Sequence, residues 1–338
     1  MTVYVGIDLH VNNSVVAMID QHAAVLFQKR YRNRIDEILS AFNAVDTPID
    51  SVVVESTFNW YWLVDGLMSA GYDVRLCNPA KADRYDGLKY SDDFSDARWL
   101  AEMRRLGILP EGYIYPPAQR AVRDLLRRRA HLVRQRSALL LSTQNLMHRN
   151  TGEQITGQII KAIARDRDAN ELLADSNLAH AIQANANVIR TLDDEVAGIE
   201  DQLKTERCQT PYIHQLKTVV GVGEILALTI ALETGDITRF PQPGNYASYC
   251  RCVKSERRSN DKRKGNANRK AGNRYLNWAF IEAAHFARRY YSGVQRFYAR
   301  KASQTNGMVA INAIANKLAR ASFYVMRDNV AFDIERAF

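Results

Sequence analysis

Short apolar runs and helix-like patterns alternate along the N-terminal part of the chain. The apolar runs predict five strands, at Val3–Asp8, Ser14–Asp20, Ala24–Lys29, Ser51–Glu55 and Asp73–Cys77. Apolar positions at helical spacing predict three helices, at Ile35–Phe42, Trp60–Ala70 and Ser91–Leu106. Three strands in hairpin succession, followed by alternating helices and strands, predict an α/β domain over residues 1–108. Its element order is that of a ribonuclease H-like fold.

The middle of the chain has helical spacing throughout. Residues 107–117 are rich in Gly and Pro and are predicted to be a linker, and residues 118–206 follow it as a helical region. In the second half of this region, apolar positions recur alternately three and four residues apart, with one polar member of the kind that can fix register. These positions are Ile182, Asn185, Ile189, Leu192, Val196, Ile199 and Leu203. The repeat is compatible with an antiparallel helical hairpin, with a coiled coil between chains and with an ordinary helical bundle.

Residues 211–338 are predicted to form a third, mostly helical domain. A turn at Gly221-Val-Gly223 precedes its first long helix, and these glycines suit either the approach of a phosphate to backbone amides or close helix packing. The basic segment Cys252–Ala271 is too polar for a core and is expected to become ordered only on a partner. A short helix is expected at Asn245–Cys250, and the last helices at Arg274–Tyr291, Val294–Ala302 and Met308–Arg327.

Positive charge is concentrated in two places. The formal net charge is +9, and the stretch Arg251–Arg274 contains ten Lys or Arg residues against two acids. Arginines also gather on one side of the helix predicted after residue 118, at Arg120, Arg123, Arg127, Arg128, Arg134 and Arg136. One-sided charge favours contact with a phosphate backbone over a merely solvated face. The residues expected to bind nucleic acid are Arg127, Arg128, Arg257, Arg258, Lys262, Arg263, Lys264, Arg269, Lys270 and Arg274.

The rest of the composition narrows the class of protein. Hydrophobic residues make up 46% of the chain, which predicts a folded protein. There is no apolar run long enough to span a bilayer and no signal-peptide pattern, so a cytoplasmic protein is expected. The four cysteines lack zinc-ligand spacing and fit a reducing compartment.

Four acids fall where the predicted fold would bring them together. Asp8 and Glu55 end two strands, and Asp93 and Asp96 lie three residues apart, on one face of a helix. Acids this close repel one another and stay ionised only around a divalent metal, for which oxygen ligands suggest Mg²⁺ or Mn²⁺. Alone, Asp93 and Asp96 would be solvated first-turn acids favoured by the helix dipole. The presence of Asp8 and Glu55 at strand ends favours a metal site over this interpretation.

A phosphate loop of the actin and sugar-kinase type is a competing interpretation of the opening strand. Such a loop needs a glycine and a hydroxyl residue crowded into the turn. The turn here, Leu9–Asn13, contains no glycine, which disfavours this interpretation.

The motifs taken together resemble the DEDD-type transposases, the Piv/MooV-like and bridge-RNA-guided recombinases of bacterial insertion sequences. The motifs that carry the resemblance are Val5-Gly-Ile-Asp8, Val54-Glu55, Asp93-Phe-Ser-Asp96-Ala97, Val220-Gly-Val-Gly223, Ser255-Glu-Arg-Arg-Ser259 and Lys270-Ala-Gly-Asn273-Arg274. They occur in the family order and cover nearly the whole chain.

The resemblance implies a RuvC-like domain with a Mg²⁺-binding acidic tetrad, a coiled coil and a C-terminal domain with a nucleophilic serine. Matched by motif, the tetrad is Asp8, Glu55, Asp93 and Asp96, and the serine is Ser259. The resemblance also implies donor and target double-stranded DNA, a structured guide RNA, a dimer or tetramer on DNA with sites composed from two chains, and a bacterial, nucleoid-associated location.

Two departures from the family pattern leave alternatives open. Asn260 follows Ser259 where the family has glycine, and Ser255 is the other serine of the motif. The spacing before the helix is also stretched, so that Asp92 is an alternative to Asp93. Two other functions compete with a serine recombinase: a metal-dependent junction nuclease that uses water, and a non-catalytic nucleic-acid-binding protein.

Overall fold

The computed structural model describes residues 2–338 except 44, 80–91, 166–168, 172, 207–211, 255–256 and 266–270. The chain divides into two compact units. The N-terminal unit is Met1–Tyr115, and the C-terminal unit comprises Pro116–Asn266 and Gly272–Phe338. The helical region and the C-terminal helices thus belong to one compact unit.

A six-stranded mixed sheet organises the N-terminal unit, with the order β3-β2-β1-β4-β5-β6. Its strands are β1 (Val3–Leu9), β2 (Asn13–Ile19), β3 (Val25–Arg32), β4 (Ile49–Glu55), β5 (Val74–Cys77) and β6 (Glu111–Gly112). β1 is antiparallel to β2 and parallel to β4, as in a ribonuclease H-like sheet. The predicted fold class, an α/β domain followed by a mostly helical remainder, is confirmed.

The segment 107–117 is not wholly a linker, as the Gly and Pro content had indicated. β6 lies within it and pairs antiparallel with β5, where Cys77 is opposite Glu111. The linker prediction is therefore wrong for Glu111 and Gly112. A two-residue strand at a sheet edge is held by backbone hydrogen bonds and leaves no apolar pattern in the sequence from which it could be predicted.

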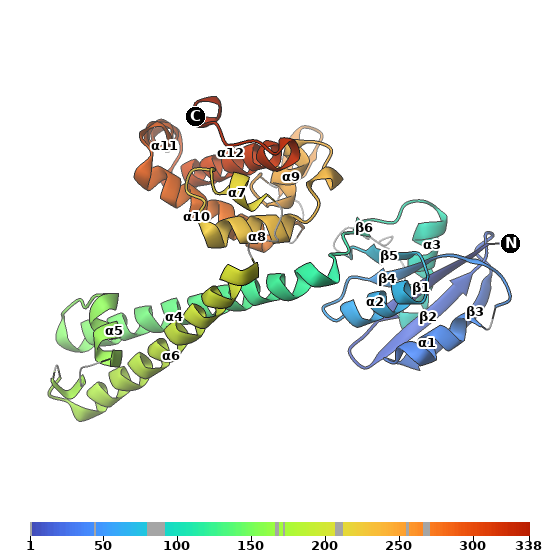
Figure 1. The fold of residues 1–338 in the computed structure, drawn as a ribbon, viewed down its shortest axis with the longest axis horizontal. Helices are drawn as coiled ribbons and strands as arrows, with labels where there is room; N and C mark the ends of the chain where they lie inside the picture. Colours follow the sequence, from blue (N-terminus) through green and yellow to red (C-terminus); the bar gives the residue numbers. More distant parts are fainter. Residues whose placement is uncertain are drawn as a thin grey trace. The chain divides into compact units, whose positions relative to one another are not determined.

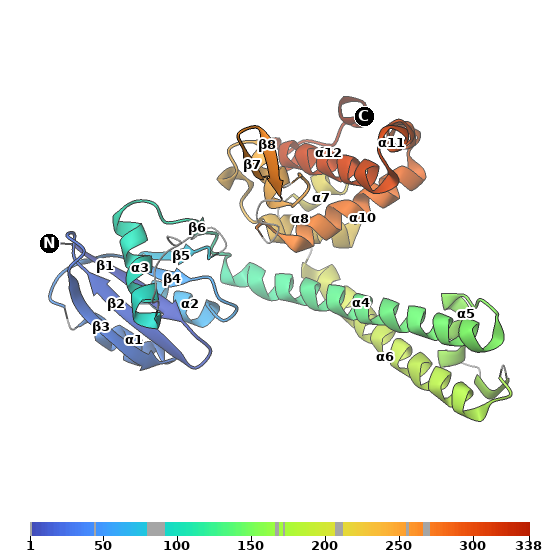
Figure 2. The ribbon, with the colours of Figure 1, turned by 180° about the vertical axis from the view of Figure 1, so that it is seen from behind.

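Helices cover both faces of the sheet (Figures 1 and 2). On one face, α1 (Ile35–Phe42) and α2 (Tyr61–Ser69) pack on the apolar side chains of β1 and β4. On the other face lies α3 (Asp93–Arg105), which contacts β1, β2 and β4. The central strands β1, β2 and β4 therefore bury both of their faces, and this explains why they are apolar with so little alternation, whereas β3 at the sheet edge is largely exposed and polar.

A helical hairpin begins the C-terminal unit (Figure 1). It consists of α4 (Pro117–Thr151) and α6 (Ser176–Glu206), with α5 (Gly157–Arg165) packed on both. The polar heptad position Asn185 donates a hydrogen bond of 3.2 Å to the buried Thr143 hydroxyl of α4. Of the arrangements that the heptad spacing left open, the structure shows a hairpin within one chain.

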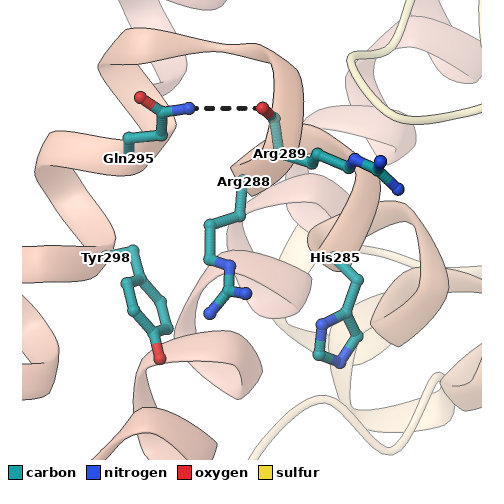
Figure 3. A pocket seen from close by; sticks show the side chains of 5 residues that line it. All are labelled: His285, Arg288, Arg289, Gln295 and Tyr298. Atoms are coloured by element: carbon teal, nitrogen blue, oxygen red, sulfur yellow. Dashed lines mark hydrogen bonds between the residues drawn. The ribbon is translucent and has the colours of Figure 1, made fainter.

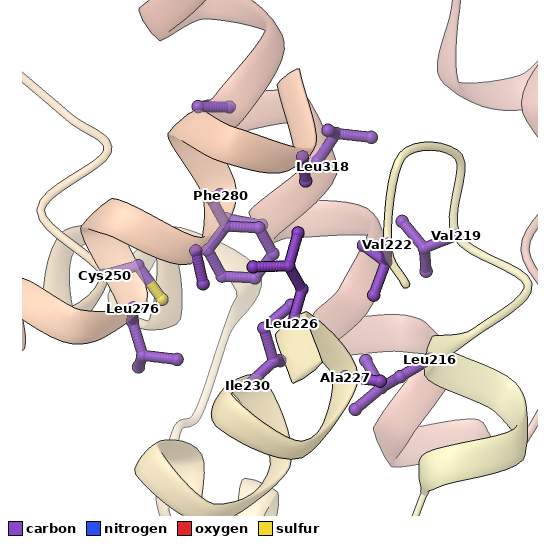
Figure 4. Packing of buried hydrophobic residues seen from close by; sticks show 14 of the residues in the cluster. Leu216, Val219, Val222, Leu226, Ala227, Ile230, Cys250, Leu276, Phe280 and Leu318 are labelled. Atoms are coloured by element: carbon purple, nitrogen blue, oxygen red, sulfur yellow. The ribbon is translucent and has the colours of Figure 1, made fainter. Parts of the chain in front are cut away.

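The remaining helices form a bundle around α8 (Glu224–Thr234), whose residues from Leu226 onward are all buried. The other helices are α7 (Ile213–Leu216), α9 (Pro243–Tyr249), α10 (Arg274–Tyr290), α11 (Ser292–Gln304), α12 (Gly307–Asp328) and α13 (Ile334–Ala337). Figure 4 shows Leu226 and Ile230 of α8 packed beside Phe280 of α10. A side chain at Gly221 would lie 2.8 Å from the Ala287 backbone nitrogen of α10. Close packing therefore accounts for this glycine.

Part of the basic segment forms a β-hairpin (Figure 2). It consists of β7 (Arg257–Ser259) and β8 (Lys262–Gly265), paired antiparallel. The expectation that the whole segment needs a partner to become ordered is therefore corrected. The turn residues Asn260 and Asp261 have φ angles of 50° and 57°, and Asn and Asp adopt this left-handed conformation more readily than other residues with a side chain.

Within the described ranges, no helix combines the length and hydropathy that crossing a lipid bilayer requires.

Candidate active site

Two acids meet at one edge of the sheet because their strands are parallel neighbours. Ile7 of β1 lies opposite Val54 of β4, and Asp8 and Glu55 are the next residues on each strand. Asp8 is only 4% exposed. Parallel strands with this register place both carboxylates on the same face, the one that α3 covers.

Glycine in β1 lets α3 come close to these acids. A Cβ atom at Gly6 would overlap the Ala97 carbonyl oxygen and lie 2.8 Å from the Ala101 nitrogen, both in the backbone of α3. The first turn of α3, with Asp93 and Asp96, is thereby held against the end of β1. The glycine of the first motif thus serves helix–sheet contact.

Replacing Gly6 by alanine is expected to push α3 off the sheet and to separate Asp93 and Asp96 from Asp8. We expect a loss of stability of roughly 1–3 kcal/mol, as for other overpacked sites, together with weaker metal binding. Denaturant unfolding and titration with Mn²⁺ measure the two effects. Gly198→Ala is the control, because a side chain there meets nothing within 4 Å. Unchanged stability and metal binding in Gly6→Ala would contradict this packing role.

Asp92 and Asp93 have different environments. The Asp92 carboxylate accepts a hydrogen bond of 2.8 Å from the Ser95 backbone nitrogen and caps α3, and the Ser95 hydroxyl accepts one from the Asp92 nitrogen. Asp93, one residue later, lies near Asp8. The helix cap therefore occupies Asp92, and Asp93 is the acid that belongs to the cluster.

Two basic residues that sequence reasoning missed contact the acids. His10 Nε2 lies 3.1 Å from Asp8 Oδ2 and 3.3 Å from Asp93 Oδ1. Arg30 Nη2 lies 2.6 Å from Asp93 Oδ2. Register could have indicated both, because His10 is two residues beyond Asp8 and because Asp8, Val15 and Arg30 form one row across β1, β2 and β3.

The charges of three other acids act on Asp8. Burial raises the pKa of Asp8 to about 6; the nearby His10 opposes this shift, and the charges of Glu55, Asp96 and Asp93 add to it. The hydrogen bond from Arg30, by contrast, holds the pKa of Asp93 below its usual range. The cluster therefore contains a carboxylate whose negative charge the protein alone does not compensate.

The residues of this cluster fit a divalent cation. One ligand atom from each of Asp8, His10 and Asp93 lies within 4.8 Å of the others. His10 Nε2 is a buried atom whose neighbours among the described residues are these two carboxylate oxygens, and its contacts with them are not aligned as hydrogen bonds. A buried ring nitrogen beside two carboxylate oxygens is a polar group that a cation would satisfy. Carboxylate oxygens favour Mg²⁺ or Mn²⁺, whereas an imidazole nitrogen is a softer ligand that suits transition metals better than Mg²⁺.

Ser259 lies in the C-terminal unit, whereas the acids lie in the N-terminal unit. It is the last residue of β7, pairs with Lys262 across the hairpin and is exposed. The next residue, Asn260, has a left-handed conformation that glycine also adopts. The substitution of Asn for the family's glycine therefore preserves the turn that follows the serine.

Comparison with known proteins identifies relatives of both units. A family model of DEDD transposases of the IS110 type matches residues 5–149. The model described as "Transposase IS116/IS110/IS902 family" matches residues 213–299. The chain carries both domains of the IS110/IS116 transposases.

Two curated relatives extend the similarity along the chain. A "Probable family 20 transposase" of Pseudomonas aeruginosa is 24% identical over 288 residues, which cover 83% of this chain and 82% of the relative. The "Transposase for insertion sequence element IS1328" of Yersinia enterocolitica is 25% identical over 342 residues, which cover 97% and 98%. The similarity to the Yersinia enterocolitica transposase therefore includes the region between the two domain matches.

Several arginines of α4 form ion pairs within the chain. Arg123 and Arg127 form ion pairs with the buried Glu233 of α8. Arg129 and Arg136 pair with Glu200 and Asp193 of α6. These ion pairs connect α4 with its neighbours, and Arg127, which was expected to bind phosphate, is paired with Glu233 within the chain. The pattern could not show this, because the paired acids lie far away in the sequence.

The other basic residues expected to bind nucleic acid are either exposed or outside the described part of the chain. Arg128, Lys262, Lys264 and Arg274 are exposed, and Arg274 lies over the Tyr275 ring. Ser255, Arg269 and Lys270 lie outside the described residues, as do the side chains of Arg257, Arg258 and Arg263.

Proposed function

We propose that this chain is a DNA transposase that cleaves and rejoins strands, using a divalent-metal centre in its N-terminal unit and a serine nucleophile in its C-terminal unit. The proposal is supported by the cluster of Asp8, His10 and Asp93 at one edge of the sheet, by the effect of the Glu55 and Asp96 charges on Asp8, and by the similarity of two segments of the chain to domains of IS110/IS116 transposases.

The acidic tetrad is the proposed metal-binding group, with His10 as an added nitrogen ligand. Mg²⁺ or Mn²⁺ bound there would polarise a scissile phosphate and stabilise its attacking and leaving oxygens. The chain's own contribution is positioning. β1 and β4 fix Asp8 and Glu55, while the Gly6 contact and the Asp92 cap fix the start of α3. Arg30 orients Asp93 through its hydrogen bond.

Ser259 is the proposed nucleophile. Its Oγ would form a phosphoester bond to the scissile phosphate as one P–O bond of the DNA breaks, and the serine proton would leave while the released oxygen becomes a hydroxyl. Rejoining reverses these steps with another DNA end. Its exposure at the end of β7 makes the hydroxyl accessible, and the neighbouring Lys262 would offset negative charge on the phosphate.

The partners of this activity are proposed from the family resemblance. They are double-stranded donor and target DNA, a structured guide RNA that selects the DNA sites, and further copies of the chain in a dimer or tetramer. The basic exposed residues Arg128, Lys262 and Lys264 are consistent with nucleic-acid contact.

Trapping of a covalent protein–DNA adduct tests the serine chemistry. The protein, co-expressed with the RNA of its element, is incubated with DNA carrying the element ends and Mg²⁺, denatured in detergent and examined for labelled DNA on the protein. Wild type and the control Ser303→Ala, which changes another exposed serine, are expected to form the adduct. Ser259→Ala should form none while still binding DNA.

The other outcomes point to the competing functions. An adduct that persists in Ser259→Ala would refute Ser259 as the nucleophile. Strand cleavage without any adduct would indicate a nuclease that uses water, and metal-independent binding without cleavage would indicate a non-catalytic binding protein.

A further inference from the structure

An open hollow of about 620 Å³ lies between α10 and α11, and none of the residues assigned so far lines it. Its lining residues are His285, Arg288, Arg289, Gln295 and Tyr298. In Figure 3, the Arg288 guanidinium extends between the Tyr298 ring and the His285 imidazole. Gln295 donates a hydrogen bond of 3.3 Å to the Arg289 carbonyl oxygen and holds the start of α11 to the end of α10.

The cations around this hollow differ from the arginines of α4. Between Ala283 and Lys301 the chain has five Lys or Arg residues and no Asp or Glu. Among the residues that the structure describes, no carboxylate lies within ion-pair distance of these cations, which are Arg288, Arg289, Arg296, Arg300 and Lys301. The protein therefore leaves a strong positive field here, of the kind that attracts a polyanion.

Aromatic rings accompany these cations. The Arg288 guanidinium lies 4.5 Å from the centre of the Tyr298 ring, and the Tyr298 hydroxyl lies so close to Gly307 that a side chain there would overlap it. Tyr298 is thus fixed between α10 and the start of α12. Tyr290, at the end of α10, is 65% exposed and has Arg289 beside its ring. An exposed ring beside unpaired arginines offers a stacking surface next to phosphate-binding groups.

We propose that this hollow and Tyr290 bind an unpaired stretch of nucleic acid, an inference that rests on the proposed function for its choice of polyanion. Arg288 and Arg289 contact successive phosphates, and Tyr290 stacks on a base. The stacking selects unpaired strands, because a duplex keeps its base faces covered by neighbouring base pairs. Either an RNA loop or a DNA strand opened during exchange presents this chemistry.

The test measures binding of the full chain to labelled single-stranded RNA, single-stranded DNA and duplex DNA over a range of salt concentrations. Three variants are compared: Arg288→Gln/Arg289→Gln, Tyr290→Ala and the control Arg327→Gln, which alters an exposed arginine already paired with Asp328. Circular dichroism checks that each variant is folded.

For the double variant, we expect weaker binding of single strands and a log–log salt slope that is shallower by about 1.4, since each lost phosphate contact removes about 0.7. Tyr290→Ala should weaken single-strand binding roughly tenfold with an unchanged slope, because stacking releases no counterions. Duplex binding should change less in both. The RNA and DNA arms show which strand the hollow prefers.

Wild-type slope and affinity in the folded double variant would overturn the proposal, and so would equal weakening of duplex and single strands. A wrong assignment of the hollow can be distinguished from a wrong proposed function. If only the hollow is misassigned, Asp8→Asn still abolishes cleavage. If the proposed function is wrong, wild type itself forms no covalent adduct with DNA, whatever the hollow binds.

Discussion

Replacing Asp8 by asparagine is expected to abolish strand cleavage and to make the metal-free N-terminal unit more stable at neutral pH. Asp8 is 4% exposed, and burial raises its pKa to about 6 from 3.8. Its ionised form is therefore disfavoured in the folded protein, and a neutral amide of the same shape removes that penalty. Cleavage is lost because an amide does not replace an anionic metal ligand.

The raised pKa also gives the stability a defined pH dependence. Between pH 3.8 and about 6 the folded protein holds the Asp8 proton while the unfolded chain releases it. The stabilisation by this group is therefore present below pH 3.8, is lost as the pH rises through about 6 and does not return at higher pH. Its size is roughly 3 kcal/mol at most, at 1.36 kcal/mol for each pKa unit. Asp8→Asn should remove this dependence.

Hydrogen exchange in β1, at pH 5 and pH 7.5 with a chelator present, reports the stability of the N-terminal unit. Asp36→Asn is the control, since Asp36 is exposed and the hydrogen bond from Arg34 lowers its pKa. Added Mg²⁺ should protect wild type and leave Asp8→Asn unchanged. A variant that still cleaves DNA, or that exchanges faster than wild type at pH 7.5, would show that Asp8 does not serve as a metal ligand.

The acidic residues could be selected from the sequence because strand ends and helix faces are local patterns. Asp8 and Glu55 follow apolar runs, and Asp93 and Asp96 share a helix face, so four residues could be selected before the strand order was known. Choosing between Asp92 and Asp93 required the cap geometry, because both residues fit the spacing. Arg30 required the register of three strands, which the motifs do not contain.

The basic residues show where a one-dimensional pattern fails. Arg127 was selected because arginines gather on one side of α4, yet that side packs against Glu233. For Arg288 and Arg289 the sequence indicates exposed charge more clearly than for Arg127, because it has no Asp or Glu between Ala283 and Lys301. Whether a cation is free depends on its partners in space, and sequence neighbours are only a partial guide to these.

Glu233→Ala is expected to destabilise the C-terminal unit by about 3–5 kcal/mol, as when one partner of a buried ion pair is removed. Glu233 is 2% exposed. Its carboxylate accepts hydrogen bonds from Arg127 Nε at 2.6 Å, Arg123 Nε at 3.1 Å and Asn273 Nδ2 at 2.7 Å. Asn273 also caps α10. One carboxylate thus joins α4, α8 and α10, and its loss removes a buried anionic partner from two arginines.

The effect of pH on Glu233 has the opposite sign to that on Asp8. Burial alone would raise the pKa of Glu233, but hydrogen bonds and charges from Arg127 and Arg123, with the hydrogen bond from Asn273, lower it overall. Its stabilisation is therefore present above the ordinary pKa of 4.5 and is lost as the pH falls.

Chemical unfolding followed in α8 and α10 at pH 7 and pH 4 should show a smaller difference between Glu233→Ala and wild type at pH 4. Glu233→Gln separates the effect of charge from that of shape, because it keeps the side-chain volume. We expect this variant to lose most of the stabilisation that Glu233→Ala loses. The control is Glu200→Ala, whose carboxylate is 37% exposed and pairs with Arg129, so that its loss should cost at most about 1 kcal/mol. If Glu200→Ala and Glu233→Ala cost the same, the buried carboxylate does not hold the three helices together.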